Sequence, residues 1–133
     1  MNWIEALIPD RRNFLPGATS ETISEVEKKL GVILPPSHKE FLRWIDGGQM
    51  TPAYIIYSAG KGIHPEETLL SANESRQTEI PLVFIAREAE EEFAFRVDEL
   101  DQPDPAVYIY RHEYEIIEKV SESFEDFVKK MFI

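Results

Sequence analysis

The stretch from residue 25 to residue 49 constrains the fold of this chain more than any other part of the sequence. It reads EVEKKLGVILPPSHKEFLRWIDGGQ, and apolar residues recur in it at helical spacing on both sides of a Leu-Pro-Pro corner. Thr19 or Ser20 is expected to cap the first helix, and Gly31 is expected to end it in a left-handed conformation. The sequence therefore predicts two short amphipathic helices that meet at a corner.

The second helix is expected to begin at Pro35-Pro36, because proline suits a first turn in which its missing N–H group loses nothing. Ser37 and Glu40 fit a capping box, and Gly47-Gly48 is expected to end the helix. Asp46 is placed to hydrogen-bond this turn through its carboxylate. The residues expected to face the core are Ile23, Val26, Leu30, Phe41, Leu42 and Ile45, with Trp44 on the flank.

The remaining sequence changes from helical to strand periodicity and back again. Helices are expected at residues 1–8 and 65–75 and from about Glu122 onward, the last capped by Ser121 or Ser123. Strands are expected at residues 54–57, 81–86, 92–97, 106–111 and 114–117, with 81–86 at the centre of the sheet. We expect one α+β domain over residues 1–133, with a mainly antiparallel sheet of about four to six strands flanked by N-terminal helices and a C-terminal helix.

The chain has 133 residues, a net charge of −11 and no cysteine, so thiolate catalysis and cysteine-based zinc sites are excluded within it. The first ten residues, MNWIEALIPD, have no basic segment and are not expected to form a secretory signal. No stretch reaches the roughly 18–20 apolar residues of a membrane span. We expect a cytoplasmic protein without a membrane partner, and phosphate repulsion argues against a nucleic-acid partner.

The familiar catalytic and metal-binding motifs are missing from the sequence. His38, His64 and His112 stand alone, without the HExxH spacing of a zinc hydrolase, and surface or structural roles are expected for them. There is no GxSxG serine motif, and residues 58–62 lack the spacing of a phosphate loop and are interpreted as a hairpin-type turn. We therefore expect no catalytic residues, no cofactor and no metal site.

Negative charge is concentrated in residues 88–104, which we call the acidic segment and which hold eight carboxylates against Arg96 alone. Such a segment suits contact with a basic protein, although acid-rich loops are more often plain solvated surface. Its aspartates do not have the spacing of a calcium loop, and a loose divalent-ion site is the weaker alternative. Five tyrosines either anchor an interface or cover the sheet edge and the rim of the core: Tyr54, Tyr57, Tyr108, Tyr110 and Tyr114. The candidate partner-binding residues are Glu90, Glu91, Glu92, Asp98, Asp101, Asp104, Tyr108, Tyr110 and Trp44.

Residues 23–48 resemble the opening motif of the SUKH superfamily, and two later pieces of the chain match it in the right order. The matching residues are Leu30-Gly31, Leu34-Pro35, Phe41-Leu42, Asp46-Gly47-Gly48, Ala106-Val107-Tyr108 and the closing Ser123-Phe124-Glu125-Asp126-Phe127. Asp46 departs from the more usual asparagine, and Pro36-Ser37-His38 from an acidic-aromatic pair. The middle region, residues 88–99, is charged and free of glycine, and it lies where family members differ.

The resemblance implies an α+β binding protein without catalytic residues. Bacterial members are mostly immunity proteins that neutralise polymorphic toxins, many of them nucleases or deaminases, and eukaryotic relatives regulate cell-wall synthesis and signalling. Our first hypothesis is therefore an immunity protein whose acidic surface meets a basic protein toxin. The alternative is a regulatory or scaffold interaction module of the same fold. A weaker third hypothesis is an acid-dependent hydrolase, which needs a carboxylate of raised pKa in a cleft near the acidic segment or Glu66-Glu67.

Overall fold

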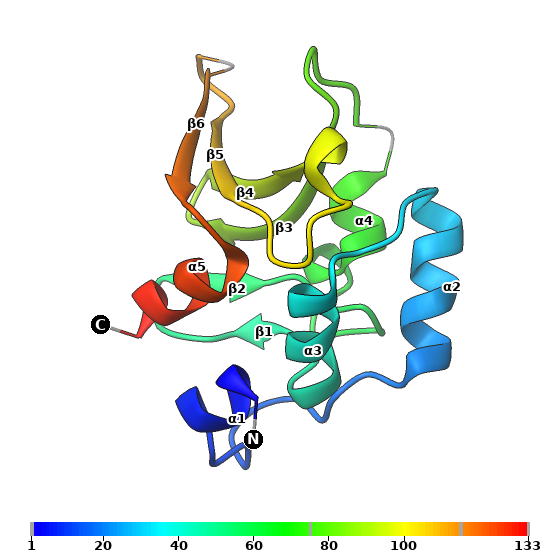
Figure 1. Cartoon of the computed structure of the whole chain (residues 1–133), viewed down its shortest axis with the longest axis vertical. Coiled ribbons are helices and arrows are strands. Elements are labelled where there is room, and N and C mark those ends of the chain that lie inside the picture. Colours follow the sequence, from blue (N-terminus) through cyan, green and yellow to red (C-terminus); the bar gives the residue numbers. More distant parts are fainter. Residues whose placement is uncertain (1, 75, 115, 133) are drawn as a thin grey trace.

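The computed structural model describes residues 2–74, 76–114 and 116–132 (Figure 1). Its strands form one antiparallel sheet in which neighbours in space are also neighbours in sequence. The strands are β1 (Gly48–Gln49), β2 (Tyr54–Ile56), β3 (Leu82–Glu88), β4 (Glu91–Arg96), β5 (Val107–Arg111) and β6 (Ile116–Ser121). The helices are α1 (Trp3–Leu7), α2 (Ser20–Leu30), α3 (Pro36–Trp44), α4 (Leu69–Asn73) and α5 (Phe124–Met131), with 3-10 turns η1 (Pro65–Glu67) and η2 (Val97–Glu99). The predicted α+β class is confirmed, with N-terminal helices and a C-terminal helix flanking an antiparallel sheet.

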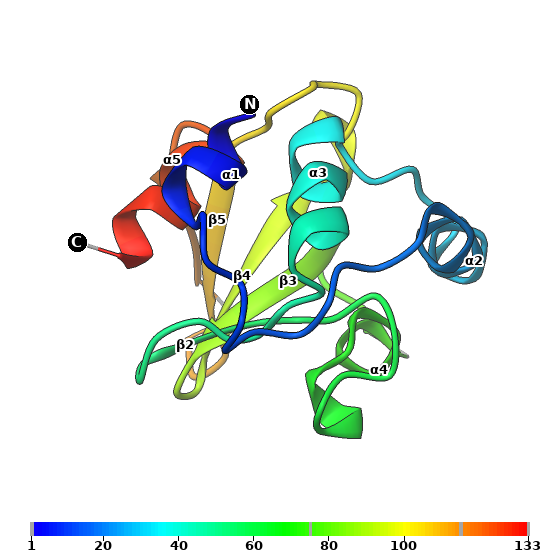
Figure 2. The same ribbon diagram turned by 90° about the horizontal axis from the view of Figure 1, so that it is seen from below.

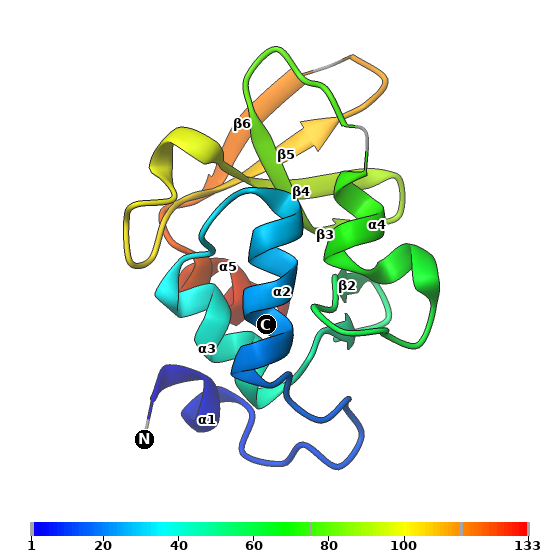
Figure 3. The same cartoon turned by 90° about the vertical axis from the view of Figure 1, so that its right-hand side faces the viewer.

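Helices cover the two faces of the sheet unequally. Helices α1, α3 and α5 lie over one face, whereas α4 lies on the opposite side of β3 (Figure 2). Helix α2 stands beside α3 and α4 (Figure 3). Beneath α1, α3 and α5, the ring of Phe124 lies 5.7 Å from that of Phe95 and 5.9 Å from that of Phe41, and all three side chains are fully buried. This aromatic cluster joins the helical layer to the sheet.

Helix α2 follows its local sequence signals closely. The Thr19 hydroxyl accepts a hydrogen bond from the Thr22 amide at 3.1 Å, and Ser20 is the first helical residue. Gly31 adopts the left-handed conformation, with φ of 75°, and ends the helix as predicted. Ile23 and Val26 are buried on its inner side. Short-range capping chemistry is thus sufficient to set both ends of α2.

Helix α3 begins at the two prolines as predicted, but the predictions for its cap and for its end were wrong. Pro35 occupies the N-cap position and no side chain caps the helix, and the Ser37 hydroxyl is buried without a hydrogen-bond partner in the described part of the chain. The Ser37 amide instead donates to the Pro103 carbonyl at 3.1 Å, so a loop distant in sequence satisfies the helix start. The helix stops at Trp44, three residues before Gly47, because Ile45 turns into extended backbone and forms a bridge with Pro16.

The turn after α3 is held by a buried carboxylate. Asp46 accepts hydrogen bonds from the amides of Ala59 at 2.7 Å and Gly60 at 2.9 Å, so it bonds a second loop rather than its own turn. Burial raises the pKa of Asp46 above its usual value, and these two hydrogen bonds oppose the change. Gly47 has φ of 70°, and a Cβ there would come within 2.5 Å of the Ile56 carbonyl oxygen. This position therefore requires glycine.

Other element boundaries differ from the predictions by a few residues. The helix expected at residues 65–75 is interrupted at Thr68, which is extended and caps α4 through the Ser71 amide; its last predicted residue lies outside the described part. Val97, expected on the same face of a strand as Phe93 and Phe95, belongs to η2 and is exposed. The last strand reaches Ser121 rather than residue 117, and Ser123 caps α5. The predicted helix at residues 1–8 appears as α1, with Met1 outside the described residues.

The two-residue turn between β3 and β4 contains the only non-glycine residue with positive φ among those described, Ala89 at 54°. Left-handed backbone costs a side-chain-bearing residue roughly 1–2 kcal/mol. We expect Ala89→Gly to raise the free energy of unfolding by about 0.5–1 kcal/mol, after the larger backbone entropy of glycine in the unfolded chain is deducted. Urea denaturation measures the change.

Ala53→Gly is the matched control for this turn. Ala53 is also exposed and lies outside helices and strands, and its φ is not positive. The same substitution there is expected to lower stability, because only the entropic effect operates. Equal effects at positions 53 and 89 would contradict backbone strain at Ala89.

Candidate functional site

The sheet divides the acidic segment into two groups at opposite ends of β4. In the strand register, Glu91 lies opposite Glu88 across the β3–β4 turn, whereas Arg96, at the other end of β4, lies opposite Leu82. Asp98 follows Arg96 in η2. A strand of six residues at about 3.3 Å per residue separates the two groups by roughly 17–20 Å. A stretch that is continuous in sequence therefore forms two distinct surfaces.

The first surface lies where β3 turns into β4 and β5 turns into β6. Because Glu92 pairs with Tyr110, the end of β5 lies beside the start of β4. Glu90 and Glu113 are exposed on the two turns. We call this region the hairpin end and define it by Glu88, Glu90, Glu91, Arg111, Glu113 and Tyr114.

One arginine is held between two carboxylates at the hairpin end. Arg111 forms ion pairs with Glu91 at 3.0 Å and with Glu118 at 3.1 Å. In the described part of the chain, Glu90 and Glu113 form no ion pair. Their carboxylates remain available to an external cation.

The second surface is the loop from η2 to β5, where two of three candidate aspartates have partners. Asp98 pairs with Arg96 at 2.8 Å, and this arginine holds the pKa of the Asp98 carboxyl below its usual value. Asp104 is half-buried and accepts a hydrogen bond from the Glu125 amide at 3.1 Å, in the first turn of α5. Asp101 is exposed. Asp104 thus supports a helix start, and Asp101 faces solvent.

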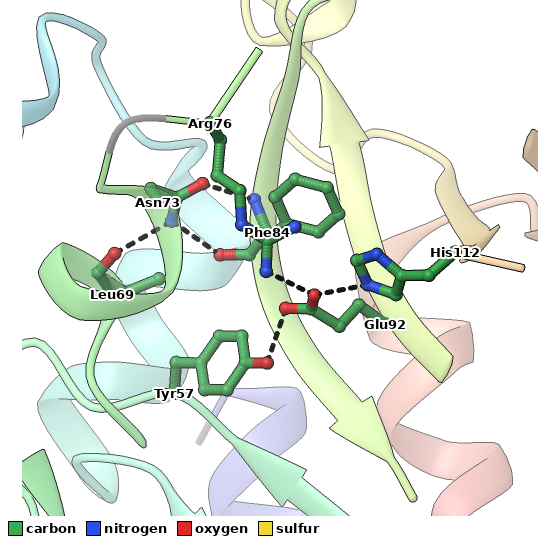
Figure 4. Close-up of polar contacts among 7 residues, drawn as sticks. All are labelled: Tyr57, Leu69, Asn73, Arg76, Phe84, Glu92 and His112. Atoms are coloured by element: carbon green, nitrogen blue, oxygen red, sulfur yellow. Dashed lines mark hydrogen bonds and ion pairs between the residues drawn. The ribbon is translucent and has the colours of Figure 1, made fainter. Parts of the chain in front are cut away.

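Glu92 is buried, unlike its neighbours in the acidic segment, and lies at the centre of a polar cluster (Figure 4). Its carboxylate accepts a hydrogen bond from the Tyr57 hydroxyl at 2.7 Å, pairs with Arg76, and lies 2.6 Å from His112 Nε2. Burial and the Glu92 carboxylate raise the pKa of Tyr57 well above its usual value. Glu92 therefore joins β2, the segment after α4 and the β5–β6 turn.

Asn73 fixes α4 onto β3 next to this cluster. Its side-chain amide donates to the carbonyl of Phe84 at 2.9 Å, and its carbonyl oxygen accepts from the Phe84 amide at 2.8 Å (Figure 4). The sheet register shifts immediately after Phe84, so a side chain supplies hydrogen bonds at an irregular point of the strand. The Arg76 guanidinium, three residues beyond Asn73, lies 4.2 Å from the centre of the Phe84 ring.

The two candidate tyrosines lie on the same sheet face as Glu92 but differ in exposure. Tyr108 is buried, and its hydroxyl donates to the Glu99 carboxylate at 2.9 Å. Burial and Glu99 raise the pKa of Tyr108. Tyr110 is half-buried, and its ring packs against Phe84 at 5.6 Å and His112 at 4.9 Å. Tyr110 therefore presents more of its surface to solvent than Tyr108.

Trp44 lies apart from these surfaces, at the end of α3. Its indole N–H donates to the Ile8 carbonyl at 2.7 Å, and the Arg11 guanidinium stacks 3.6 Å from its ring centre. Arg11 also donates to the Trp44 carbonyl at 2.9 Å. Trp44 thus holds the chain after α1 against α3.

The structure brings Glu90 and Glu91 together with Tyr114, one of the five tyrosines named from the sequence, and with Arg111 and Glu113, which the sequence did not single out. Arg111, Glu113 and Tyr114 join them at the hairpin end, and the Tyr114 side chain is strongly exposed, at 66%. The predicted strands at residues 106–111 and 114–117 form a hairpin, and the first of them runs antiparallel to β4. This arrangement, if recognised from the sequence, would have placed the two turns at one end of the sheet. Charge counting along the sequence could not do so.

The histidines do not assemble a catalytic or metal site in the part of the chain that the structure describes. No group of three or more histidine, aspartate or glutamate side chains there could hold a metal ion. His38 is fully buried between Phe95 and Phe124, with ring centres 5.3 and 5.1 Å away, and burial lowers its pKa to about 3. No helix among the described residues is long and apolar enough to cross a membrane.

A six-stranded antiparallel meander flanked by N-terminal helices and a C-terminal helix is the α+β class that the sequence motifs predicted. The chain belongs to the SMI1 / KNR4 family (SUKH-1), whose model matches residues 17–130, and the predicted resemblance to the SUKH superfamily is thereby confirmed. This family is known for toxin-immunity proteins. A search of curated proteins found no match to the chain.

Proposed function

We propose that this protein is an immunity protein that binds a cognate protein toxin and neutralises it. The observation that carries the proposal is membership of the SMI1 / KNR4 family over residues 17–130 in a chain of net charge −11. In this proposal the protein acts in the cytoplasm, without a cofactor or metal, by occupying the toxin's surface rather than by catalysis.

Exposed carboxylates at both ends of β4 supply the attraction in this proposal. Glu90 and the half-exposed Glu91 lie at the hairpin end, and Asp98 and Asp101 lie at the other end. A toxin that acts on nucleic acid needs a basic surface to hold phosphates, and an acidic protein can cover that surface. Glu92, Asp104 and Tyr108 contribute indirectly, because their internal contacts hold the segments that carry these acids. Trp44 holds the chain after α1 against α3, away from these acids.

Co-expression tests the immunity function directly. The chain is produced in cells that carry an inducible toxin encoded beside its gene, and growth is compared with and without the chain. Survival only when the chain is present supports immunity. Death in both cases, with the two proteins failing to co-purify, would reject immunity and favour the regulatory module of the same fold.

The salt dependence of association tests the electrostatic part of the proposal. We expect the association rate constant to fall by about tenfold or more as ionic strength rises from about 0.01 M to 1 M, because the screening length shrinks from about 30 Å to about 3 Å. The dissociation rate constant should change much less. Stopped-flow fluorescence at several salt concentrations measures both, and a salt-independent association rate would contradict steering by these carboxylates.

A further inference from the structure

Two open depressions meet at the Glu91–Arg111 ion pair of the hairpin end. The first, of about 290 Å³, lies between the sheet and α5, and its apolar lining includes Phe93, Ile109 and Phe127. The second, of about 470 Å³, lies between the β3–β4 and β5–β6 turns and is bordered by Tyr114. Glu91 and Arg111 line both depressions, so the two depressions adjoin at this ion pair, and we call them together the groove.

Carboxylates dominate the rim of this groove. Glu88, Glu90, Glu91 and Glu113 line it, against the cations Arg111 and Lys130. Arg111 is already paired with Glu91 and Glu118, and Lys130 lies 3.5 Å from Asp126 on its own helix. Excess negative charge over a partly apolar floor favours a ligand with cationic groups on aliphatic stems.

A residue that lines the groove carries an unpaired hydroxyl. Ser121 lines the depression beside α5 and is buried, and its hydroxyl has no hydrogen-bond partner within residues 2–74, 76–114 and 116–132. Buried polar groups in native proteins are nearly always paired, so an unpaired one calls for an explanation. The hydroxyl oxygen is covered by its neighbours, so a polar group of a ligand reaches it only when the side chains around it move.

We propose that this groove is the toxin-binding site and that it receives an extended, basic segment of the toxin. The inference rests on the proposed function and selects the hairpin end over the surface that carries Asp98 and Asp101. Lysine or arginine side chains of the segment meet Glu90 and Glu113, and their stems lie against Tyr114 and the apolar floor. Aromatic residues at the edge of such a site add area and cation–π contacts.

Charge-reversal pairs locate the site. Glu90→Lys with Glu113→Lys changes two exposed residues of the groove, and Glu25→Lys with Glu66→Lys makes the same change in net charge at exposed positions of α2 and η1. We expect the first pair to weaken toxin binding at least tenfold and the second less than about threefold, since distant exposed charges are screened. Tyr114→Ala should weaken binding about fivefold or more.

A third pair distinguishes this inference from the function on which it rests. If Asp98→Lys with Asp101→Lys abolishes binding while Glu90→Lys with Glu113→Lys does not, the groove is the wrong surface but immunity stands. If the chain gives no protection and binds no toxin, the proposed function fails, and the groove is then tested with the basic peptide acetyl-(Arg-Ala)₃-amide.

The peptide titration follows the NMR signals of Ile109 and Tyr114, both of which line the groove. We expect saturable shifts with a dissociation constant on the order of millimolar. A basic-segment site is supported if the shifts are lost in the Glu90→Lys, Glu113→Lys pair and kept in the Glu25→Lys, Glu66→Lys pair. Equal losses in both pairs, or shifts confined to residues outside the groove, would overturn it.

Discussion

Glu92→Gln is expected to lower the free energy of unfolding by about 2–4 kcal/mol, because it removes the buried charge that Tyr57, Arg76 and His112 share. The glutamine amide keeps the size of the side chain but is neutral, and with its oxygen toward Arg76 and His112 it turns its N–H donors toward the Tyr57 hydroxyl. The full cost of breaking a buried ion pair, about 3–5 kcal/mol, is reduced here because Arg76 and His112 are partly exposed and can regain water.

Urea denaturation, followed by far-UV circular dichroism, measures the change. Glu90→Gln is the matched control, since Glu90 lies in the same acidic segment but is exposed, and its replacement should change stability by less than about 0.5 kcal/mol. Tyr57→Phe, which removes one of the three contacts, should lie between the two variants. If both glutamines have the same small effect, Glu92 is not an internal anchor.

The second prediction concerns the loss of folding stability at acid pH. His38 is fully buried, and neither ring nitrogen has a hydrogen-bond partner among the described residues. Burial lowers its pKa in the folded state from 6.5 to about 3, so below pH 6.5 the unfolded chain binds a proton that the folded chain does not. Stability is unaffected by His38 above pH 6.5, and falls by about 1.4 kcal/mol per pH unit between 6.5 and about 3.

Replacement of His38 by leucine should remove this slope. Between about pH 7 and pH 5, the free energy of unfolding of the native chain is expected to fall by about 2 kcal/mol more than that of His38→Leu. His64→Leu is the control, because His64 is exposed and should leave the pH dependence unchanged. Identical slopes in the native chain and His38→Leu would mean that His38 takes up its proton without unfolding.

Elements governed by neighbouring residues could be predicted from the sequence. Thr19 and Gly31 set the ends of α2 within one turn of themselves, and the apolar spacing of Phe124, Phe127, Val128 and Met131 identified α5. For α3, the two prolines identified the start, but the partner of the first turn and the end of the helix could not be predicted in this way. Its first turn is satisfied by Pro103 and its last turn is broken by a bridge to Pro16, and both partners are remote in sequence.

The candidate site, too, depends on contacts between residues that are remote in sequence. Charge counting identified residues 88–104 as acidic, but the fold decides which acids reach solvent. Glu92 turns inward because Tyr57, Arg76 and His112 converge on it, and Asp104 supports α5. Glu113 escaped notice, and Tyr114 was not connected with Glu90, because a strand pairing, and not their local sequence, places them beside Glu90.

The two turns at the hairpin end have a consequence for how such a protein can change over generations. Glu90, Glu113 and Tyr114 are exposed, and exposed substitutions usually alter stability by less than about 0.5 kcal/mol. Gly47 and Glu92, in contrast, are fixed by close backbone approach and internal ion pairing. If the hairpin end binds the toxin as we propose, the contact residues can change during evolution by substitutions in the two turns, while the scaffold that presents them is retained.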